Sequence, residues 1–458
     1  MKLMPQDIHF VDIDDNTTLF FHVPTLQIYP LQKSNEILDF LRQVQHYGFD
    51  SAREICNIED FEEKYQYVCK TIDNAPASSY HTYDISQVNF SHVVLPIAGH
   101  CNLNCPYCFA QTDGGFHFND YTEKDITDIV DFLVNKNPDI EQPITLIFFG
   151  GEPLLRLDII KFTIRYISER YPNRKFGYSI TTNGTILNED IIQVIHDSNM
   201  SVLLSVDGPD NEFNLRKFRN GTKSIDVVLK NIQTLKDNHI SIELRATLVN
   251  TNPYVLETFR FFEDLQLPFH IVFAYQSENT SHHYADYCDE TIENIRQQLR
   301  EVVEYYRSKV LNGEKVYNKL LGNLHQTLHY RNISNVCCGA GWSFFTILSN
   351  GTILPCTHFV NDTHYSIGNI HEQVLDEQKR EQFSATDIAH IEGCQNCWAK
   401  NLCLGGCVAE KLCQGYSNKM PLDTAACQLK KVLWDFYIEL YYHFRNNTPK
   451  SAETQENI

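Results

Sequence analysis

The sequence predicts an α/β protein built on a partial, TIM-like (β/α)6 barrel. Six apolar, strand-like segments alternate with helical segments between residues 88 and 273, which is typical of parallel strands joined by crossover helices. A closed eight-stranded barrel needs more strand–helix units than residues 86–275 contain. A strand-rich segment precedes the barrel, and a segment crowded with cysteines follows it. We therefore expect a small α+β, winged-helix-like domain before the barrel and a cysteine-rich domain after it.

The first 85 residues have the pattern of a hairpin followed by helices. Residues 8–13 alternate apolar and polar side chains, as a half-buried strand does, and residues 18–23 and 26–29 continue as strands. Ser34 is the predicted N-cap of a helix that includes Ile37, and a second helix is expected over residues 58–71. The small, polar stretch 74–79 indicates a linker into the barrel.

The barrel strands are predicted at residues 93–97, 144–149, 177–182, 202–207, 242–248 and 269–273. Helices are expected at residues 123–135 and 157–169. The predicted units are an N-terminal domain at 1–85, the barrel at 86–300, a helical bridge at 301–335, the cysteine-rich domain at 336–445 and a polar, disordered tail at 446–458.

Composition and charge restrict the class of protein. A protein of 458 residues is too long for one compact core, and 43% hydrophobic residues is an ordinary globular value. No apolar run approaches the ~20 residues of a membrane span, and the N-terminus has no secretory signal. A net charge of −20 disfavours binding to nucleic-acid phosphates. We expect a cytoplasmic protein with no nucleic-acid and no membrane partner.

Fifteen cysteines in such a protein indicate metal rather than disulfides. Three lie at 101–108 and nine between 337 and 427, whereas Cys56, Cys69 and Cys288 stand apart and are interpreted as ordinary thiols.

The first cluster of cysteines has the spacing Cys101-x-x-x-Cys105-x-x-Cys108, in the loop after the first barrel strand. Thiolates are the usual ligands of iron–sulfur clusters, which normally take four. Three protein ligands leave one iron with an open position, where a substrate or cofactor can bind. A zinc site or unrelated buried thiols are the alternatives for this motif taken alone.

This motif resembles that of the radical SAM enzymes. The resemblance implies that Cys101, Cys105 and Cys108 hold a [4Fe–4S] cluster that binds S-adenosylmethionine (SAM) and cleaves it to a 5′-deoxyadenosyl radical. Gly150-Gly151-Glu152-Pro153 ends the second strand, and in this family such a motif contacts the methionyl amino group of SAM.

Further SAM contacts are implied at later strand ends. Asn183 lies in a Thr-Thr-Asn-Gly strand end, and Ser205 is expected to bond the SAM ribose or carboxylate. Arg216 falls where the family places a carboxylate-binding arginine, although Lys217 and Arg219 are close enough in sequence to leave this choice open. Tyr107 should pack near the adenine.

The C-terminal cysteines resemble the seven-cysteine SPASM pattern. A hairpin is predicted from residues 344–348 and 352–354, turning at Asn350-Gly351, which would bring Cys338 and Cys356 together at its base.

The resemblance to the SPASM pattern implies two auxiliary [4Fe–4S] clusters, hence three in all. The first takes Cys338, Cys356 and Cys407 with a fourth ligand from outside the seven, for which Cys337 is one candidate. The second takes Cys394, Cys397, Cys403 and Cys427, with Cys413 an alternative to Cys427. Two Cys₄ zinc sites are the other interpretation.

One position helps to choose among reactions. In sulfatase-maturating relatives the cysteine matching Cys356 is followed directly by an aspartate base, but here Thr357 and His358 follow. His358 is a candidate acid–base group, with a structural histidine as the alternative. The stretch looks more like the thioether-forming maturases of the sactipeptide and ranthipeptide groups.

The predicted function is a peptide maturase that forms thioether crosslinks from Cys sulfur to carbon. Its expected partners are a precursor peptide, with a leader held by residues 1–85 and a Cys-containing core, and an external flavodoxin or ferredoxin-like electron donor. The alternatives are carbon–carbon (cyclophane-type) crosslinking, residue epimerisation and sulfatase maturation. From another class, a non-catalytic iron–sulfur scaffold could present a peptide to a partner.

Overall fold

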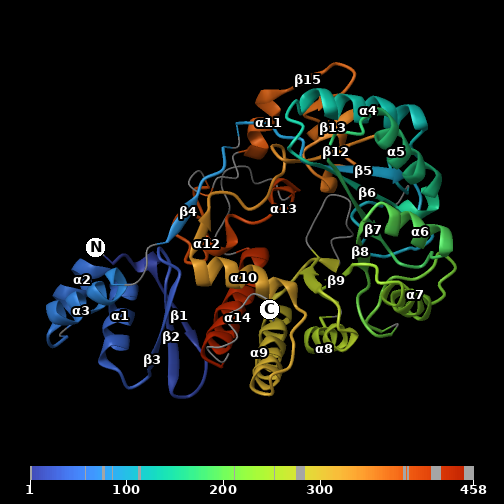
Figure 1. Cartoon of the computed structure of the whole chain (residues 1–458). Coiled ribbons are helices and arrows are strands. Elements are labelled where there is room, and N and C mark those ends of the chain that lie inside the picture. The colour runs from blue at the N-terminus through green and yellow to red at the C-terminus, as the bar shows by residue number, and fades with distance from the viewer. Residues whose placement is uncertain are drawn as a thin grey trace.

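The computed structural model describes residues 3–56, 58–74, 78–84, 86–111, 115–210, 212–251, 253–274, 284–384, 388, 391–413 and 424–447. The N-terminal domain lies at one end of the molecule and the barrel at the other, with the long helices α9 and α14 between them (Figure 1). No helix within the described ranges is long and apolar enough to cross a membrane.

The N-terminal domain is a three-stranded antiparallel sheet in the order β1-β2-β3 with helices packed beside it. Leu3, Ile8, Phe20, Phe40 and Leu41 are among the residues of its own apolar core. Its elements are η1 (Pro5–Asp7), β1 (Ile8–Asp12), β2 (Thr17–His22), β3 (Gln27–Gln32), α1 (Glu36–Tyr47), α2 (Phe49–Ile55) and α3 (Phe61–Asp73). The predicted strands and helices are confirmed, and α2 is additional.

The predicted N-cap of α1 is wrong by one residue. The side chain of Asn35, not Ser34, accepts the hydrogen bond from the backbone N–H of Ile37 at 2.8 Å. Ser and Asn are both favoured at the N-cap position, so residue type alone does not distinguish Ser34 from Asn35.

The barrel contains six parallel strands, as predicted, and their order in the sheet is β10-β9-β8-β7-β6-β5. They are β5 (His92–Ala98), β6 (Ile144–Gly150), β7 (Phe176–Thr182), β8 (Ser201–Ser205), β9 (Ile242–Leu248) and β10 (Phe269–Phe273). The connecting helices are α4 (Glu123–Lys136), η2 (Pro153–Arg156), α5 (Leu157–Arg170), α6 (Glu189–Asp197), α7 (Ile225–Asp237) and α8 (Val255–Leu265).

The two faces of this sheet differ. In β9, Leu244, Ala246 and Leu248 are buried, whereas Glu243, Arg245 and Thr247 alternate with them and are only partly buried. Alternate residues point to opposite faces of a strand. The apolar set therefore packs under the helices, and the other set faces the inside of the barrel.

The sheet continues past β5 into the cysteine-rich domain. The predicted hairpin is confirmed as β12 (Phe344–Ile347) and β13 (Thr352–Leu354), and β12 pairs in parallel with β5. With β14 (Gly368–Asn369) and β15 (Val374–Leu375), the sheet has ten strands among the described residues. The remaining elements of this domain are η4 (Thr357–Phe359), η5 (Thr363–Tyr365), α11 (Glu377–Ser384), α12 (Lys400–Cys403) and α13 (Val408–Cys413).

Long helices join the two ends of the molecule. Helix α14 (Ala425–Asn447) packs along α9 (Asp289–Leu311) and also contacts β1. His9 of β1 stacks on Trp398, with ring centroids 3.4 Å apart, and bonds Asp435 of α14 at 2.7 Å. The N-terminal domain is thereby attached to the C-terminal region of the protein.

Helix α10 (Lys319–Tyr330) leads to β11 (Asn332–Ser334), which pairs with β4 (Ser79–His81). Helix α14 extends to Asn447, so the predicted disordered tail is wrong at its first two residues, and its remainder, 448–458, lies outside the described residues.

Candidate active site

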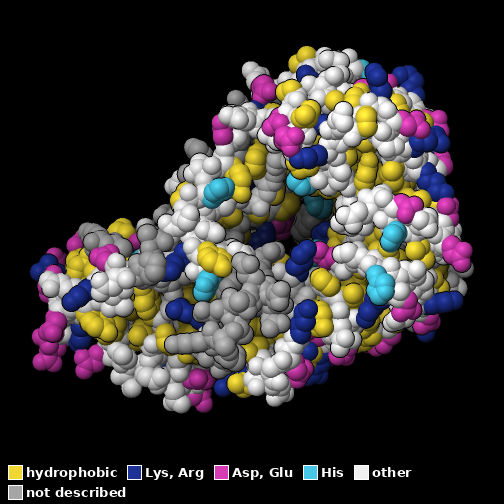
Figure 2. Space-filling model, viewed as in Figure 1, with side chains coloured by type: hydrophobic (Ala, Val, Ile, Leu, Met, Phe, Trp, Pro, Cys, Tyr) yellow, Lys and Arg dark blue, Asp and Glu magenta, His cyan; other side chains and the backbone are white. Residues whose placement is uncertain are grey.

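A cavity of about 450 Å³ occupies the inside of the barrel, and we name it the barrel cavity. Figure 2 shows a hollow at the centre of this face of the molecule, with histidine, lysine and arginine side chains near its rim. The barrel cavity is lined by inward-facing residues of β6 to β10, by the loop after β5 and by the segment that follows β13. The predicted site residues that line it are Cys101, Cys105, Tyr107, Cys108, Gly150, Gly151, Asn183, Ser205, Arg216, Cys356 and His358.

The two glycines at the end of β6 allow that strand to press against the cysteine loop. The backbone N–H of Gly151 donates to Ala98, and that of Glu152 donates to His100, one residue before Cys101. A Cβ on Gly151 would lie 2.1 Å from the His100 carbonyl oxygen. Gly150 has φ +137°, a backbone conformation in which a residue with a side chain would be strained. No larger residue fits at Gly151 without moving the loop that carries Cys101.

Glu152 is fully buried and does not line the barrel cavity. Its carboxylate accepts hydrogen bonds from the backbone of Leu154 (3.1 Å), the Thr182 hydroxyl (2.7 Å) and the backbone of Asn183 (2.8 Å). Burial raises the pKa of Glu152 to about 7, and these donors oppose that shift. The side chain thus ties the end of β6 to the end of β7. From there, the Asn183 amide donates to Asn102 at 2.9 Å and contacts the Cys101 sulfur at 3.6 Å.

Asp207 organises the opposite wall of the barrel cavity. Its carboxylate accepts hydrogen bonds from Arg216 Nε (3.0 Å), from the Tyr107 hydroxyl and from the backbone of Thr247 (3.1 Å). The Arg216 guanidinium also lies 5.5 Å from the centre of the Tyr107 ring. Arg216 and Tyr107 were expected from the sequence as site residues, whereas the Asp207 carboxylate that joins them was not.

The cysteine-rich domain contributes a further wall. Cys356 is buried at the start of η4, and the ring of His358 lies 4.5 Å from that of Phe109, just after Cys108. Burial, with the Arg245 cation nearby, lowers the pKa of His358 to about 3, so the ring is neutral. The segment that follows Cys356 therefore faces the loop of the first cysteine motif.

The remaining cysteines gather in two neighbouring places. Cys394, Cys397, Cys403 and Cys427 line one small cavity together with Lys400, Lys430 and Lys431. Cys337, Cys403 and Cys407 line a larger, mainly apolar cavity of about 650 Å³. Charge interactions also link Cys337 and Cys407 with Cys338. The larger cavity shares Val272, Phe273 and Ala274 with the barrel cavity, so the two are neighbours across β10.

Two protein-family models match this sequence. The model of the radical SAM superfamily matches residues 95–262, and that of the SPASM iron–sulfur cluster-binding domain matches residues 337–398. The protein is a radical SAM enzyme with a SPASM domain.

Relatives of this radical SAM enzyme include a sulfatase-maturating enzyme and a cyclopropyl synthase. An uncharacterised protein of Methanocaldococcus jannaschii is 33% identical over 168 residues, which are 37% of this protein and 56% of that relative. The cysteine-type anaerobic sulfatase-maturating enzyme of Clostridium novyi is 26% identical over 353 residues, covering 70% of this protein and 89% of the relative. Radical SAM cyclopropyl synthase TigE of Paramaledivibacter caminithermalis is 22% identical over 480 residues, covering 94% of each.

Solved structures share the fold. Native anSMEcpe with bound AdoMet has a TM-score of 0.63 at 20% identity, covering 78% of this protein and 98% of that one. Streptococcus suis SuiB bound to precursor peptide SuiA has a TM-score of 0.52 at 16% identity, covering 93% of this protein and all of that one. Both similarities concern architecture, since their identities are low.

The cysteines of the radical SAM enzyme fit iron–sulfur clusters by their chemistry. None of the cysteines whose side chains are described forms a disulfide. Burial raises the pKa of the Cys101 thiol to about 11, so a bound metal is needed to hold it as thiolate. Within the described ranges, no three His, Cys, Asp or Glu side chains converge tightly enough for a single metal ion. A four-iron cluster is larger and takes its thiolates farther apart.

Arg245 lines the barrel cavity but was not among the residues expected there from the sequence. It lines the barrel cavity beside Thr247, from the inward-facing side of β9. Its signal was present in the sequence: Glu243, Arg245 and Thr247 alternate with apolar residues in a strand that the barrel should otherwise bury.

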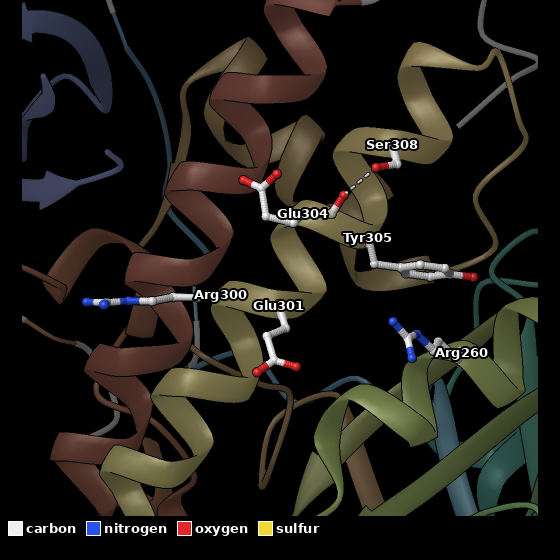
Figure 3. Close-up of a pocket in the computed structure, with 6 residues that line it drawn as sticks. All are labelled: Arg260, Arg300, Glu301, Glu304, Tyr305 and Ser308. Carbon is white, nitrogen blue, oxygen red and sulfur yellow. Dashed lines mark hydrogen bonds between the residues drawn. The ribbon is translucent and has the colours of Figure 1, made fainter. Parts of the chain in front are cut away.

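A separate pocket of about 540 Å³ lies away from all of these cysteines, between α8 and α9. Figure 3 shows its residues: Arg260, Arg300, Glu301, Glu304, Tyr305 and Ser308. The Arg260 guanidinium lies 5.7 Å from the centre of the Tyr305 ring. None of the predicted site residues lines this pocket, and its mixed charges are those of a solvated helix surface.

Proposed function

We propose that this radical SAM enzyme crosslinks a ribosomally made precursor peptide, forming a thioether between a cysteine sulfur and a carbon of the same peptide. The observation that carries the proposal is the barrel cavity itself. It is lined by the three cysteines of the core motif and by Cys356 and His358 of the SPASM domain. A substrate in this cavity touches both parts of the enzyme.

The proposed roles of the residues follow from this arrangement. Cys101, Cys105 and Cys108 hold the core [4Fe–4S] cluster. When bound there, the cluster and SAM together supply a 5′-deoxyadenosyl radical that abstracts hydrogen from carbon. Gly150, Gly151, Asn183, Ser205 and Arg216 bind and orient SAM, and Glu152 and Tyr107 support them. The apolar walls of the barrel keep water from the reacting carbon.

One auxiliary site is proposed from a shared cavity, and the other from the resemblance to the SPASM pattern. Cys394, Cys397, Cys403 and Cys427 would hold one [4Fe–4S] cluster, since all four line one cavity. Cys338, Cys356 and Cys407 would hold the other. Cys337 lines the larger cavity with Cys407, which supports it as the fourth ligand, and Cys403 of the other proposed cluster lines that cavity too. Three clusters in all, reduced by an external flavodoxin or ferredoxin-like donor, are part of the proposal.

The overall reaction balances without another oxidant. The sulfur–carbon bond replaces one S–H and one C–H bond of the peptide: the C–H hydrogen ends on 5′-deoxyadenosine, and the thiol hydrogen leaves as a proton. One SAM becomes methionine and 5′-deoxyadenosine, and the electron used to cleave SAM is returned after the bond forms. Each crosslink therefore lowers the peptide mass by two hydrogens and uses one SAM.

A second candidate is a carbon–carbon bond within the peptide. It is favoured by the similarity to TigE, a cyclopropyl synthase by name, which extends over 94% of both proteins. Sulfatase maturation is less favoured, because Thr357 rather than aspartate follows Cys356.

The test is the mass of the small cysteine-containing peptide encoded beside the gene, after anaerobic co-expression with the enzyme. A loss of two hydrogens per site with no thiol left to alkylate supports the thioether. The same loss with every thiol alkylatable supports carbon–carbon bond formation and rejects the thioether. An unchanged mass rejects both reactions for this peptide. A Cys105→Ala variant is the control, and it should yield unmodified peptide and no 5′-deoxyadenosine.

A further inference from the structure

The Arg245 side chain enters the barrel cavity from β9, at the level of Ser205 on β8 and His270 on β10, with which it is paired in the sheet. In the described part of the protein, no hydrogen bond and no ion pair joins its guanidinium to another group. An arginine keeps its charge in any protein environment, so an unpartnered one inside a barrel is energetically unfavourable.

The carboxylates near Arg245 are already engaged. Glu243, two residues earlier on the same strand, bonds His270 at 2.9 Å and also pairs with Lys319. Asp207 is bonded to Arg216. Two charges act on Arg245: Arg216 as a like charge and Glu243 as an opposite one. Glu243 nevertheless forms its ion pairs with His270 and Lys319 and not with Arg245. Among the described residues, the barrel cavity therefore holds a positive charge at Arg245 that no neighbouring carboxylate pairs with.

The core cluster does not account for this charge. Arg216 is the arginine that acts on Cys105 and Cys108. Arg245 acts instead on His358, which belongs to the SPASM wall of the cavity. Arg245 thus lies near the SPASM wall of the barrel cavity, where the proposed function puts the substrate peptide.

We propose that Arg245 binds a carboxylate of the substrate peptide, either an Asp or Glu side chain or the peptide's own terminal carboxylate, close to the residue that is modified. The inference rests on the proposed function, since it names a feature of the substrate at the same cavity. The planar guanidinium forms two parallel hydrogen bonds with a carboxylate, which would orient the peptide as well as hold it.

The test uses the cluster-loaded enzyme with SAM and without reductant, so binding is measured in the absence of turnover. The probes are N-acetyl-aspartate methylamide and N-acetyl-asparagine methylamide, which differ only in the charged group, and calorimetry measures their affinities. We expect the wild type to prefer the aspartate probe by roughly ten-fold or more and Arg245→Gln to lose that preference. Arg260→Gln, in the separate pocket between α8 and α9 (Figure 3), is the matched control and should keep it.

Two further measurements assign the result. SAM affinity is compared in the same variants: a ten-fold loss in Arg245→Gln, with no effect on the probes, would assign the carboxylate to SAM and overturn the proposal. Equal affinity of the wild type for both probes would also overturn it.

Removal of an unpartnered charge in Arg245→Gln should leave the thermal midpoint of the free protein unchanged or raised, whereas a lowered midpoint would show a structural role instead. Formation of 5′-deoxyadenosine by the wild type is assayed separately, so a failure of the proposed function is told apart from a failure of this inference.

Discussion

Arg216 and Tyr107 are held by opposite oxygens of one carboxylate. Arg216 Nε donates to Asp207 Oδ1 at 3.0 Å, and the Tyr107 hydroxyl donates to Oδ2. Asp207 is 2% exposed, so water does not replace Arg216 or Tyr107 as its hydrogen-bond partner. The proposed SAM-binding arginine and the ring beside the core cysteines are thus positioned together.

Replacing Asp207 with Asn should weaken SAM binding by roughly ten-fold or more. The substitution keeps the size of the side chain but removes the charge that orients Arg216, and a buried hydrogen bond to a charged group is worth about 1.5–3 kcal/mol. Equilibrium dialysis with labelled SAM, on the cluster-loaded enzyme, measures the effect. Asp190→Asn is the control, because Asp190 pairs with Lys161 on the surface. Equal SAM affinity in the two variants would contradict the positioning role.

A second prediction separates two roles of Glu152. The resemblance to the family implies contact with the SAM amino group, whereas the structure has both carboxylate oxygens bonded to groups of the protein. In Glu152→Gln, one amide N–H₂ would face a backbone or hydroxyl donor. We therefore expect a loss of about 1–3 kcal/mol in the free energy of unfolding, measured by denaturant titration. Unchanged stability with lost SAM affinity would instead support direct contact with SAM.

The barrel strands were predictable because each is an apolar run of the right length between helical segments. The predicted bounds of β9 and β10 are those of the structure. The pairing of β12 with β5 was not predictable, because Phe344 and His92 are far apart in the sequence and neither strand's own pattern names its neighbour.

In the candidate site too, local features could be predicted from the sequence, whereas contacts between distant residues could not. Cysteine spacing indicated the core motif, because spacing is a local property. The resemblance to the SPASM pattern implied the four cysteines that line the small cavity. The network around Asp207 joins side chains from separate loops and strands, and the unpartnered state of Arg245 depends on which carboxylates are already engaged. Only the folded protein shows such relationships.

The pH dependence of stability should reveal the Glu243 ion pairs. The hydrogen bond from His270, together with Lys319, lowers the pKa of Glu243 to about 2. An unfolded Glu has a pKa of about 4.3. The folded state therefore gains stability above about pH 5, and this gain is lost as the pH falls through about 4 toward about 2.

Thermal midpoints of the wild type and Glu243→Gln between about pH 7 and about pH 3.5 test this. The variant should be less stable at neutral pH, and the difference should shrink on acidification. The exposed pair Asp190–Lys161 serves as control, since Asp190→Asn should change little at any pH. A difference that stays constant with pH would show that the carboxylate's charge does not matter.

Lys430 should raise the reduction potentials of the auxiliary clusters. It lines both the small cavity and the larger, mainly apolar cavity that contain the C-terminal cysteines. It is bonded to Glu410 and acts on both Cys403 and Cys407. A nearby cation stabilises the reduced, more negative cluster. Lys430→Met should therefore lower the midpoint potentials by on the order of 50 mV, and Glu410→Gln should raise them.

The measurement is a redox titration followed by electron paramagnetic resonance. Cys101, Cys105 and Cys108 are replaced with Ala, so that only auxiliary signals are present. Lys161→Met, at the surface pair with Asp190, is the control and should leave the potentials unchanged. Shifts of the same sign in the Lys430 and Glu410 variants would contradict an electrostatic role.

The final prediction concerns how the N-terminal domain would hold a leader peptide. Strand β3 ends the order β1-β2-β3, and its outer edge is unpaired within the described residues. The N–H of Lys33 bonds inward to Asn16. Bonding directions alternate along an antiparallel strand, so the backbone groups of Ile28 and Pro30 and the N–H of Gln32 point outward. The Gln32 carbonyl is already engaged, since it accepts from the N–H of Asn35.

Pro30 has no N–H, so Ile28 and Gln32 supply the outward donors that an added strand needs. Gln32→Pro should therefore weaken binding of the precursor leader by roughly ten-fold, because it removes one backbone donor without altering the inward ladder. Gln32→Ala keeps the N–H and is the matched control. Fluorescence anisotropy of the labelled leader measures both. A similar affinity in the two variants would show that the leader, if bound, is not held as a fourth strand on β3.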